Sequence, residues 1–294
     1  MAADEWDEVG ERVFRKRFDP CDVTVTAVLG ATGVAVVDTR CSIAEAREVK
    51  DQLRKLTHTP VRWVVNTHPH FDHTWGNAEF VEPRQSPPAT IWGHETLPAR
   101  FDREDPTLAE HIAMLNTGGA QWRERVAALE LVPPTRLVRD RAEIDLGDRV
   151  LELVHLGRGH TDGDLWLAVH APGERITGEQ SVDVLLAGDL IEQSGPPAYG
   201  PDSFPLEWAP TLDRALGMIG SGTAVIPGHG ETVDAAFVRH QRSTIDAIAR
   251  EIRRLHAAAV PVERAAKEGS WPLPVPELRS AITRGYAALS VSDA

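Results

Sequence analysis

The stretch of sequence that decides the fold reads Thr67-His68-Pro69-His70-Phe71-Asp72-His73-Thr74-Trp75-Gly76-Asn77. It follows a predicted strand over residues 61–65 and places four potential metal ligands within six residues. Crowded imidazoles and a carboxylate each need a partner, because burial without one costs several kcal/mol. In an extended segment His68 and His70 project to the same side and can share one metal, while Asp72 and His73 reach a second. Borderline metals such as zinc accept these nitrogen and oxygen donors. The motif therefore predicts a metal site, rather than a surface loop with incidental metal affinity.

Three more potential ligands stand at the ends of predicted strands. His160 ends the segment from Val154, Asp189 ends the segment from Val184, and His229 ends the segment from Val225. A glycine next to each one lets the backbone approach a crowded centre closely. A ligand at a strand end is held by a rigid scaffold while it faces an open cleft. Taken singly, His160 or His229 could be structural, but the shared context points to one site.

Together these motifs resemble the metallo-β-lactamase superfamily. The signature His-x-His-x-Asp-His is present as His68 to His73, and Gly159-His160-Thr161, Gly188-Asp189 and Gly228-His229-Gly230 follow in the family's order. The resemblance covers roughly residues 23–255. It implies an α+β fold, a four-layer αββα sandwich of two mixed sheets with helices on both outer faces, and a dinuclear site on one edge.

The resemblance also implies a ligand set. Metal 1 would take His68, His70 and His160, and metal 2 would take Asp72, His73 and His229. Asp189 would bridge the two metals or bind metal 2. The cofactors expected are two Zn²⁺ ions, with iron or manganese as alternatives. Two such cations lower the pKa of a shared water, and Asp72 is the expected catalytic residue that orients it.

Periodicity divides the chain into short strands and amphipathic helices. Strands are predicted over 23–29 and 34–38, around a Gly30–Gly33 turn, and over 90–92, 149–156, 165–170, 182–187 and 223–226. Helices are predicted over 42–56, 208–219, 235–256 and 277–289, with an interrupted helical insertion over 97–131. We expect one domain over 1–258 that includes this insertion, followed by a helical C-terminal tail over 259–294 that packs on it or extends it.

Charge and hydropathy narrow the choice of partners. The formal net charge of −13 disfavours nucleic acid as the main partner. The acidic N-terminus lacks the pattern of an export signal, and no apolar run approaches the roughly 18–20 residues that span a bilayer. We therefore expect a cytoplasmic protein that acts on a small molecule, away from membranes. The oligomeric state stays open.

The two cysteines, Cys21 and Cys41, form neither a Cys-x-x-Cys metal motif nor a disulfide framework. They flank the predicted hairpin. With a two-residue loop Cys21 lies opposite Ser42 and the two sulfurs face opposite sides, whereas a loop one residue longer would make them neighbours. We interpret them as two reduced structural cysteines.

The function that the resemblance implies is hydrolysis of an ester, lactone, thioester or cyclic amide by a zinc-dependent dinuclear centre. The alternatives are an iron-dependent oxidoreductase that uses persulfide or dioxygen, and a β-lactamase. Residues 190–213 contain no Lys, Arg or His, whereas lactamases of the family usually place a cation there. The gap of 87 residues from His73 to His160 argues against the compact thioester-hydrolase arrangement. Predicted substrate contacts are Tyr199, Trp75 and Arg158, and Trp92, Trp122 and Trp208 are further candidates for the pocket wall. We expect His94 to be structural.

Overall fold

The structure of the chain is a computed structural model that describes residues 5–171 and 182–292. Residues 1–4, part of the N-terminus used above to argue location, lie outside the described residues. The strands are β1 (Asp7–Gly10), β2 (Val13–Phe18), β3 (Val23–Leu29), β4 (Val34–Val37), β5 (Val61–Val65), β6 (Thr90–His94), β7 (Arg136–Val138), β8 (Arg141–Asp145), β9 (Val150–Val154), β10 (Trp166–His170), β11 (Val184–Glu192) and β12 (Ala224–His229). The helices are α1 (Ile43–Leu56), α2 (Phe71–Thr74), α3 (Pro106–Thr117), α4 (Ala120–Ala127), α5 (Trp208–Leu216), α6 (Ala235–Ala257), α7 (Val262–Glu268) and α8 (Val275–Ser292), with 3-10 turns over Asn77–Phe80 and Leu97–Phe101.

The strands of the described residues form one mixed, curved sheet. Its order is β7-β6-β5-β4-β3-β12-β11-β10-β9-β8, with β2 paired to β3 and β1 paired to β2. The sequence predicted two mixed sheets in a sandwich; the α+β sandwich is confirmed, but the strands of its two halves are joined in one curved sheet. The two halves are joined where Val23 of β3 pairs with His229 of β12. A pairing between such distant segments leaves no periodic signal in either one, so the sequence could not show it.

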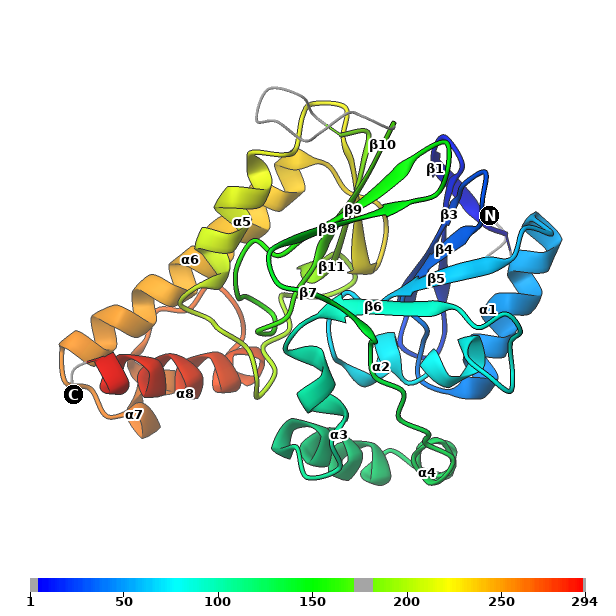
Figure 1. Cartoon of the computed structure of the whole chain (residues 1–294). Helices are drawn as coiled ribbons and strands as arrows, with labels where there is room; N and C mark the ends of the chain where they lie inside the picture. Colours follow the sequence, from blue (N-terminus) through cyan, green and yellow to red (C-terminus); the bar gives the residue numbers. More distant parts are fainter. Residues whose placement is uncertain (1–4, 172–181, 293–294) are drawn as a thin grey trace.

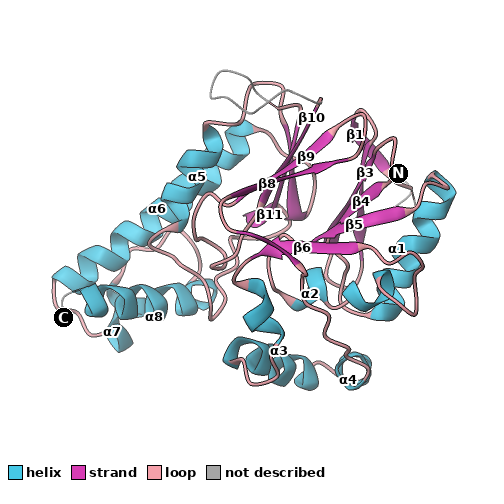
Figure 2. Cartoon of the chain, viewed as in Figure 1, coloured by secondary structure: helices cyan, strands magenta, loops and turns pink. Residues whose placement is uncertain are grey.

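Helices cover both outer faces of this sheet (Figures 1 and 2). α1 packs on the half that contains β3 to β5, where Val36 and Leu53 share one buried cluster. α5 and α6 pack on the half that contains β10 to β12, where Leu185 and Ile248 share another, and α8 packs on α6. The cluster between the two halves includes Val28, Val37, Val65, Leu151, Leu167 and Ile226. The result is an α+β fold in which the loops at one edge of the sheet are free to build a site.

Most predicted elements are present, but the four strands β1, β2, β7 and β8 were not predicted, and the helical regions also differ. Ser42 caps α1, since its side chain accepts a hydrogen bond from the Glu45 amide. The insertion contains α3 and α4, which are separated at Gly118 and Gly119 as predicted; Gly119 has a φ of +105° that favours glycine. α7 was not predicted, and α8 extends beyond the predicted helix at both ends. In the described part of the chain, no helix combines the length and apolarity that a membrane span requires.

The expected geometry of the cysteines was wrong, although the expected register of the hairpin was right. Thr26 pairs with Val37 across a two-residue loop, which would set Cys21 opposite Ser42. The two sulfurs nevertheless lie 3.4 Å apart. The ladder ends before either cysteine is reached, and the chain then leaves the pleat, with left-handed φ angles of 57° at Asp22 and 70° at Arg40. The alternation of faces that the prediction used does not apply beyond the ladder.

Candidate metal centre

Seven side chains from distant parts of the sequence converge at one edge of the sheet. His68 and His70 lie in the loop after β5, and α2 follows at once with Asp72 and His73. The loop after β9 supplies His160, β11 supplies Asp189, and the end of β12 supplies His229. All are buried except His229, whose side chain is 12% exposed. These are the seven residues that the sequence singled out as ligands.

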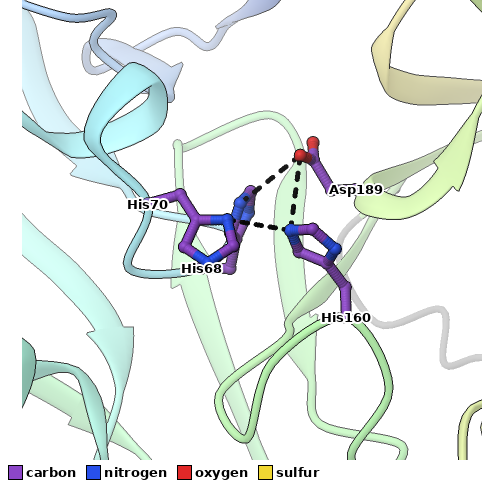
Figure 3. A group of neighbouring side chains, drawn as sticks. All are labelled: His68, His70, His160 and Asp189. Carbon is purple, nitrogen blue, oxygen red and sulfur yellow. Dashed lines mark hydrogen bonds and ion pairs between the residues drawn. The ribbon is translucent and has the colours of Figure 1, made fainter. Parts of the chain in front are cut away.

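The seven side chains divide into two adjoining groups. His68, His70, His160 and Asp189 place their potential ligand atoms within 4.8 Å of one another, and Asp72, His73 and His229 do the same. In the first group, shown in Figure 3, His160 Nε2 lies 2.9 Å from His70 Nδ1 and 3.5 Å from Asp189 Oδ2. The same carboxylate lies 3.2 Å from His73 Nε2 and 3.3 Å from His229 Nε2 in the second group. Asp189 therefore stands between the two groups.

Each of the five histidines has an oxygen partner on the ring nitrogen that faces away from the cluster. The pairs are His68 Nδ1 with Thr67 Oγ1 (3.0 Å), His70 Nε2 with Asp202 (3.2 Å), His73 Nδ1 with Asp38 (2.8 Å), His160 Nδ1 with the Ala198 carbonyl (3.0 Å) and His229 Nδ1 with the Cys21 carbonyl (2.9 Å). These contacts fix the ring orientations and direct the other nitrogen of each ring inward. The inward atoms are Nδ1 of His70 and Nε2 of the other four.

The donor atoms fit divalent cations. Among the described residues, the buried His68 Nε2 has no hydrogen-bond partner, and the buried Asp189 Oδ1 has only the ion pair with His73 Nε2 at 3.2 Å. Leaving a buried polar atom without a partner costs about 1–3 kcal/mol, and a cation between the ligands would satisfy both atoms. Imidazole nitrogens and carboxylates together suit zinc, and they also suit iron and manganese. The residues present therefore fit two divalent cations.

The charges in the cluster show what the side chains do for one another in the absence of cations. Burial lowers the pKa of His68 well below its ordinary value and lowers that of His160 to about 4. Burial acts in the same direction on His73, but the negative charges of Asp189, Asp72 and Asp38 outweigh it and raise the pKa of His73 well above its ordinary value. The pKa of Asp189 is lowered in return, against the effect of burial, by His73 and the neighbouring histidines. Protons here occupy places that metals would take.

Three acidic residues near the site, Asp38, Asp202 and Glu192, were not predicted from the sequence. Asp38 accepts hydrogen bonds from His73 and from the amide and hydroxyl of Thr67. It follows strand β4 directly, which is the signal that identified Asp189, so it could have been found.

Asp202 lies in the loop rich in Pro and Gly, and its position carries no such signal. Glu192 ends β11, and its carboxylate lies within 4.8 Å of ligand atoms of Asp189 and His229. Burial and then the charge of Asp189 raise its pKa well above the ordinary value.

Asp202 is expected to act through His70. Its carboxylate is buried and accepts a hydrogen bond from His70 Nε2, which turns Nδ1 toward the cluster. We expect Asp202→Asn to weaken binding at metal site 1 by about 10–100-fold, the range seen when such outer hydrogen bonds are lost. Titration with Co²⁺ against a chelator measures this affinity. Asp213→Asn, on the exposed face of α5 where Asp213 pairs with Arg242, is the matched control and should bind as tightly as the wild type.

The three predicted substrate contacts lie in different surroundings: one is ion-paired and two are buried against apolar side chains. Arg158 is paired to Glu207 by two hydrogen bonds of 2.6 and 2.9 Å, so its charge is already matched. Trp75 is buried against Leu108. Tyr199 is buried against Trp208, and its hydroxyl has no partner among the described residues.

Other aromatic residues bring the helical insertion next to the site. The ring of His111 in α3 lies 4.9 Å from that of His70 and 5.8 Å from that of Phe71. Phe71 in turn lies 5.9 Å from Trp122 of α4. His111 was not predicted, because no strand-end or glycine context marks it in the sequence. His94 lies outside the cluster and stacks on His155 at 4.2 Å.

Comparison with known proteins places this site in a family context. The chain is 28% identical to a human acyl-coenzyme A thioesterase, MBLAC2, over 73% of this chain and 71% of that protein. It is also 28% identical to the alpha subunit of a 2,4-dinitroanisole O-demethylase from Nocardioides sp. (strain JS1661), over 69% of this chain and 51% of that one. Among solved structures, the sec-alkylsulfatase Pisa1 from Pseudomonas sp. superposes with a TM-score of 0.71 at 16% identity, covering 97% of this chain and 50% of that chain.

A metallo-β-lactamase from Pontibacter korlensis superposes with a TM-score of 0.57 at 19% identity, covering 82% of this chain and 98% of that chain. At these identities the two structural likenesses show the fold alone. The family model described as the metallo-beta-lactamase superfamily matches residues 18–230, which include all seven clustered side chains. The chain therefore belongs to the metallo-β-lactamase superfamily.

Proposed function

We propose that this protein is a dinuclear metal-dependent hydrolase that cleaves an ester, lactone, thioester or cyclic amide of a small organic substrate. The observation that carries the proposal is the pair of adjoining ligand groups with Asp189 between them. A scaffolding protein without catalytic function would have no need to keep both groups intact. The human relative named as an acyl-coenzyme A thioesterase supports thioesters and esters among the four substrate classes, even though the long gap between His73 and His160 argued against thioesters.

The chain's own residues divide the work of the site. His68, His70 and His160 would hold one cation, and Asp72, His73 and His229 would hold the other, with Asp189 shared. When bound, the two cations lower the pKa of water and polarise the carbonyl under attack. The Asp72 carboxylate would orient the attacking water and accept a hydrogen bond from it. Asp38, Asp202 and the two backbone carbonyls keep the imidazoles in place.

The helical insertion supplies an apolar side to the site. The His111 ring is in contact with those of His70 and Phe71, and the Phe71 ring is in turn in contact with that of Trp122. Aromatic walls with few charges favour a substrate whose group beside the scissile bond is apolar. We propose that the acyl or alkyl part of the substrate lies against this wall.

We expect weak or absent hydrolysis of β-lactams and clear activity on at least one uncharged ester, lactone or thioester. A β-lactam carries a carboxylate, and burying it without a cation is strongly unfavourable. Residues 190–213 offer no basic side chain, Arg158 is paired to Glu207, and Glu192 adds a carboxyl group at this edge. Charged hydrogen bonds of the missing kind contribute on the order of 1.5–3 kcal/mol, or roughly tenfold to over a hundredfold in affinity.

Steady-state kinetics with a penicillin, a carbapenem, a homoserine lactone, an aryl ester and an acyl thioester measure this preference. A catalytic efficiency near the 10⁶ M⁻¹s⁻¹ order typical of good enzymes for either β-lactam would contradict it. Equal, low rates on all five substrates would leave the hydrolase proposal without a substrate in the classes named.

A further inference from the structure

The structure holds a pair of thiols beside the metal centre that the proposed function does not use. Cys21 Sγ and Cys41 Sγ lie 3.4 Å apart, and both cysteines are free. Cys41 is 1% exposed, whereas Cys21 is partly exposed. A disulfide requires sulfurs about 2.0 Å apart, so closing the bond needs a movement of about 1.4 Å. The pair is therefore close enough to be oxidised without unfolding.

Both thiols lie on segments that hold ligands of the second group. The Cys21 carbonyl accepts the hydrogen bond from His229 Nδ1 at 2.9 Å. Three residues before Cys41, Asp38 accepts the bond from His73 Nδ1 at 2.8 Å, and the amide of Thr39 donates to the His73 carbonyl at 2.8 Å. A movement that joins the sulfurs pulls directly on the backbone that orients His229.

A buried arginine keeps the two cysteine segments together. The Arg40 guanidinium donates to the Asp19 carbonyl at 2.5 Å, spanning from the segment of Cys41 to that of Cys21. It also lies 4.4 Å from the centre of the Phe18 ring. The Arg40–Asp19 hydrogen bond is present while both cysteines are free. The two thiols are therefore held as a pair in the reduced protein.

We propose that Cys21 and Cys41 form an oxidisable dithiol site whose oxidation to a disulfide weakens metal binding at His229 and its neighbours. The oxidant class is a hydroperoxide. The sulfur of Cys21, the more exposed thiol, attacks the peroxide; the O–O bond breaks, and Cys21 sulfenic acid and one water (or alcohol) form. The sulfur of Cys41 then attacks the Cys21 sulfur, the S–O bond breaks, and water leaves. Two thiols lose two electrons and two protons, and one hydrogen peroxide becomes two waters.

The first test is mass spectrometry of the metal-loaded protein after treatment with hydrogen peroxide. The disulfide predicts a loss of two hydrogens, the disappearance of both thiols from a titration of the unfolded chain, and recovery of both with dithiothreitol. One equivalent of phenylarsine oxide, a probe that bridges paired thiols, should protect both cysteines from peroxide. Stepwise addition of oxygen to Cys21 alone, with Cys41 still reduced, would overturn the proposal. So would independent reaction of the two thiols with separate molecules of the probe.

The second test asks whether formation of the disulfide weakens metal binding. The affinity of the more weakly held metal is measured by Co²⁺ titration before and after peroxide, and we expect it to fall by about tenfold, as when an outer hydrogen bond to a ligand is lost. Cys21→Ser, which keeps the backbone carbonyl, should show no such fall and controls for oxidation of methionine. A disulfide that leaves the Co²⁺ affinity unchanged contradicts the coupling. This inference rests on the proposed metal centre only for its second test, because the mass and thiol measurements do not depend on hydrolysis.

Discussion

Replacing Asp189 with alanine is expected to remove about half of the bound metal and to lower turnover by about 100-fold or more. Asp189 is the carboxylate that lies between the two ligand groups, 3.5 Å from His160, 3.2 Å from His73 and 3.3 Å from His229. Its negative charge offsets the repulsion between two cations held close together. Without it, the group containing Asp72, His73 and His229 has a single carboxylate left, and the second cation binds weakly.

Metal content by mass spectrometry and turnover of the best substrate from the panel measure this effect. Asp183→Ala is the matched control, because Asp183 is exposed and immediately precedes the start of β11, away from the clustered side chains. The control should match the wild type in both measurements. Equal metal content and equal turnover in Asp189→Ala and the wild type would remove Asp189 from the site.

Removing the metals with a chelator is expected to make stability fall as the pH rises from about 6.5 to 8.5. In the metal-free protein the pKa values of His73 and His229 are raised: burial opposes this, but Asp189 and the other carboxylates prevail. A raised histidine pKa stabilises the folded state fully below about pH 6.5, the unfolded value. This stabilisation is lost as the pH rises toward the pKa that the histidine has in the folded protein. The pKa of Asp164, raised to about 8 chiefly by burial, acts in the same direction.

For each proton that only the folded state holds, the free energy of unfolding falls by about 1.4 kcal/mol per pH unit. We therefore expect the Tm of the chelated protein to drop by roughly 2–4 °C or more for each pH unit. The metal-loaded protein should not follow this trend, because metals displace the protons and bind more tightly as the pH rises. Calorimetry of both forms across this range measures the difference. Parallel pH profiles, with or without chelator, would contradict the prediction.

The seven clustered residues could be predicted from the sequence because their signal is local. Four of them stand within six residues, and the other three were each predicted at the end of a strand beside a glycine, so neither inference needed the tertiary structure. In the structure only His229 ends a strand, since Asp189 lies inside β11 and His160 in the loop after β9. The groups that orient these ligands were harder to find. Asp202 reaches His70 across 132 positions of sequence, and the Cys21 carbonyl reaches His229 across 208. A backbone carbonyl has no residue signature at all.

The fold could be predicted at the level of its elements and less well at the level of their connections. Short β-branched runs identified most strands, and Ser42 identified the start of α1. The pairing of Val23 with His229 joins the two sheet halves. It forms between segments that are far apart in the sequence, so no local pattern predicts it. The proximity of Cys21 and Cys41 was missed for a related reason, since left-handed residues end the ladder on which the prediction was based.

The measurement that tests the central claim most directly is an equilibrium titration of the chelated protein with Zn²⁺, with turnover recorded at each point. The account predicts two ions bound per chain, with turnover of an ester or thioester returning only as the second site fills. Retention of full turnover in the chelated protein would contradict a metal-dependent hydrolase. So would a protein that binds one iron per chain, takes up no second ion, and consumes dioxygen instead of hydrolysing any substrate of the panel.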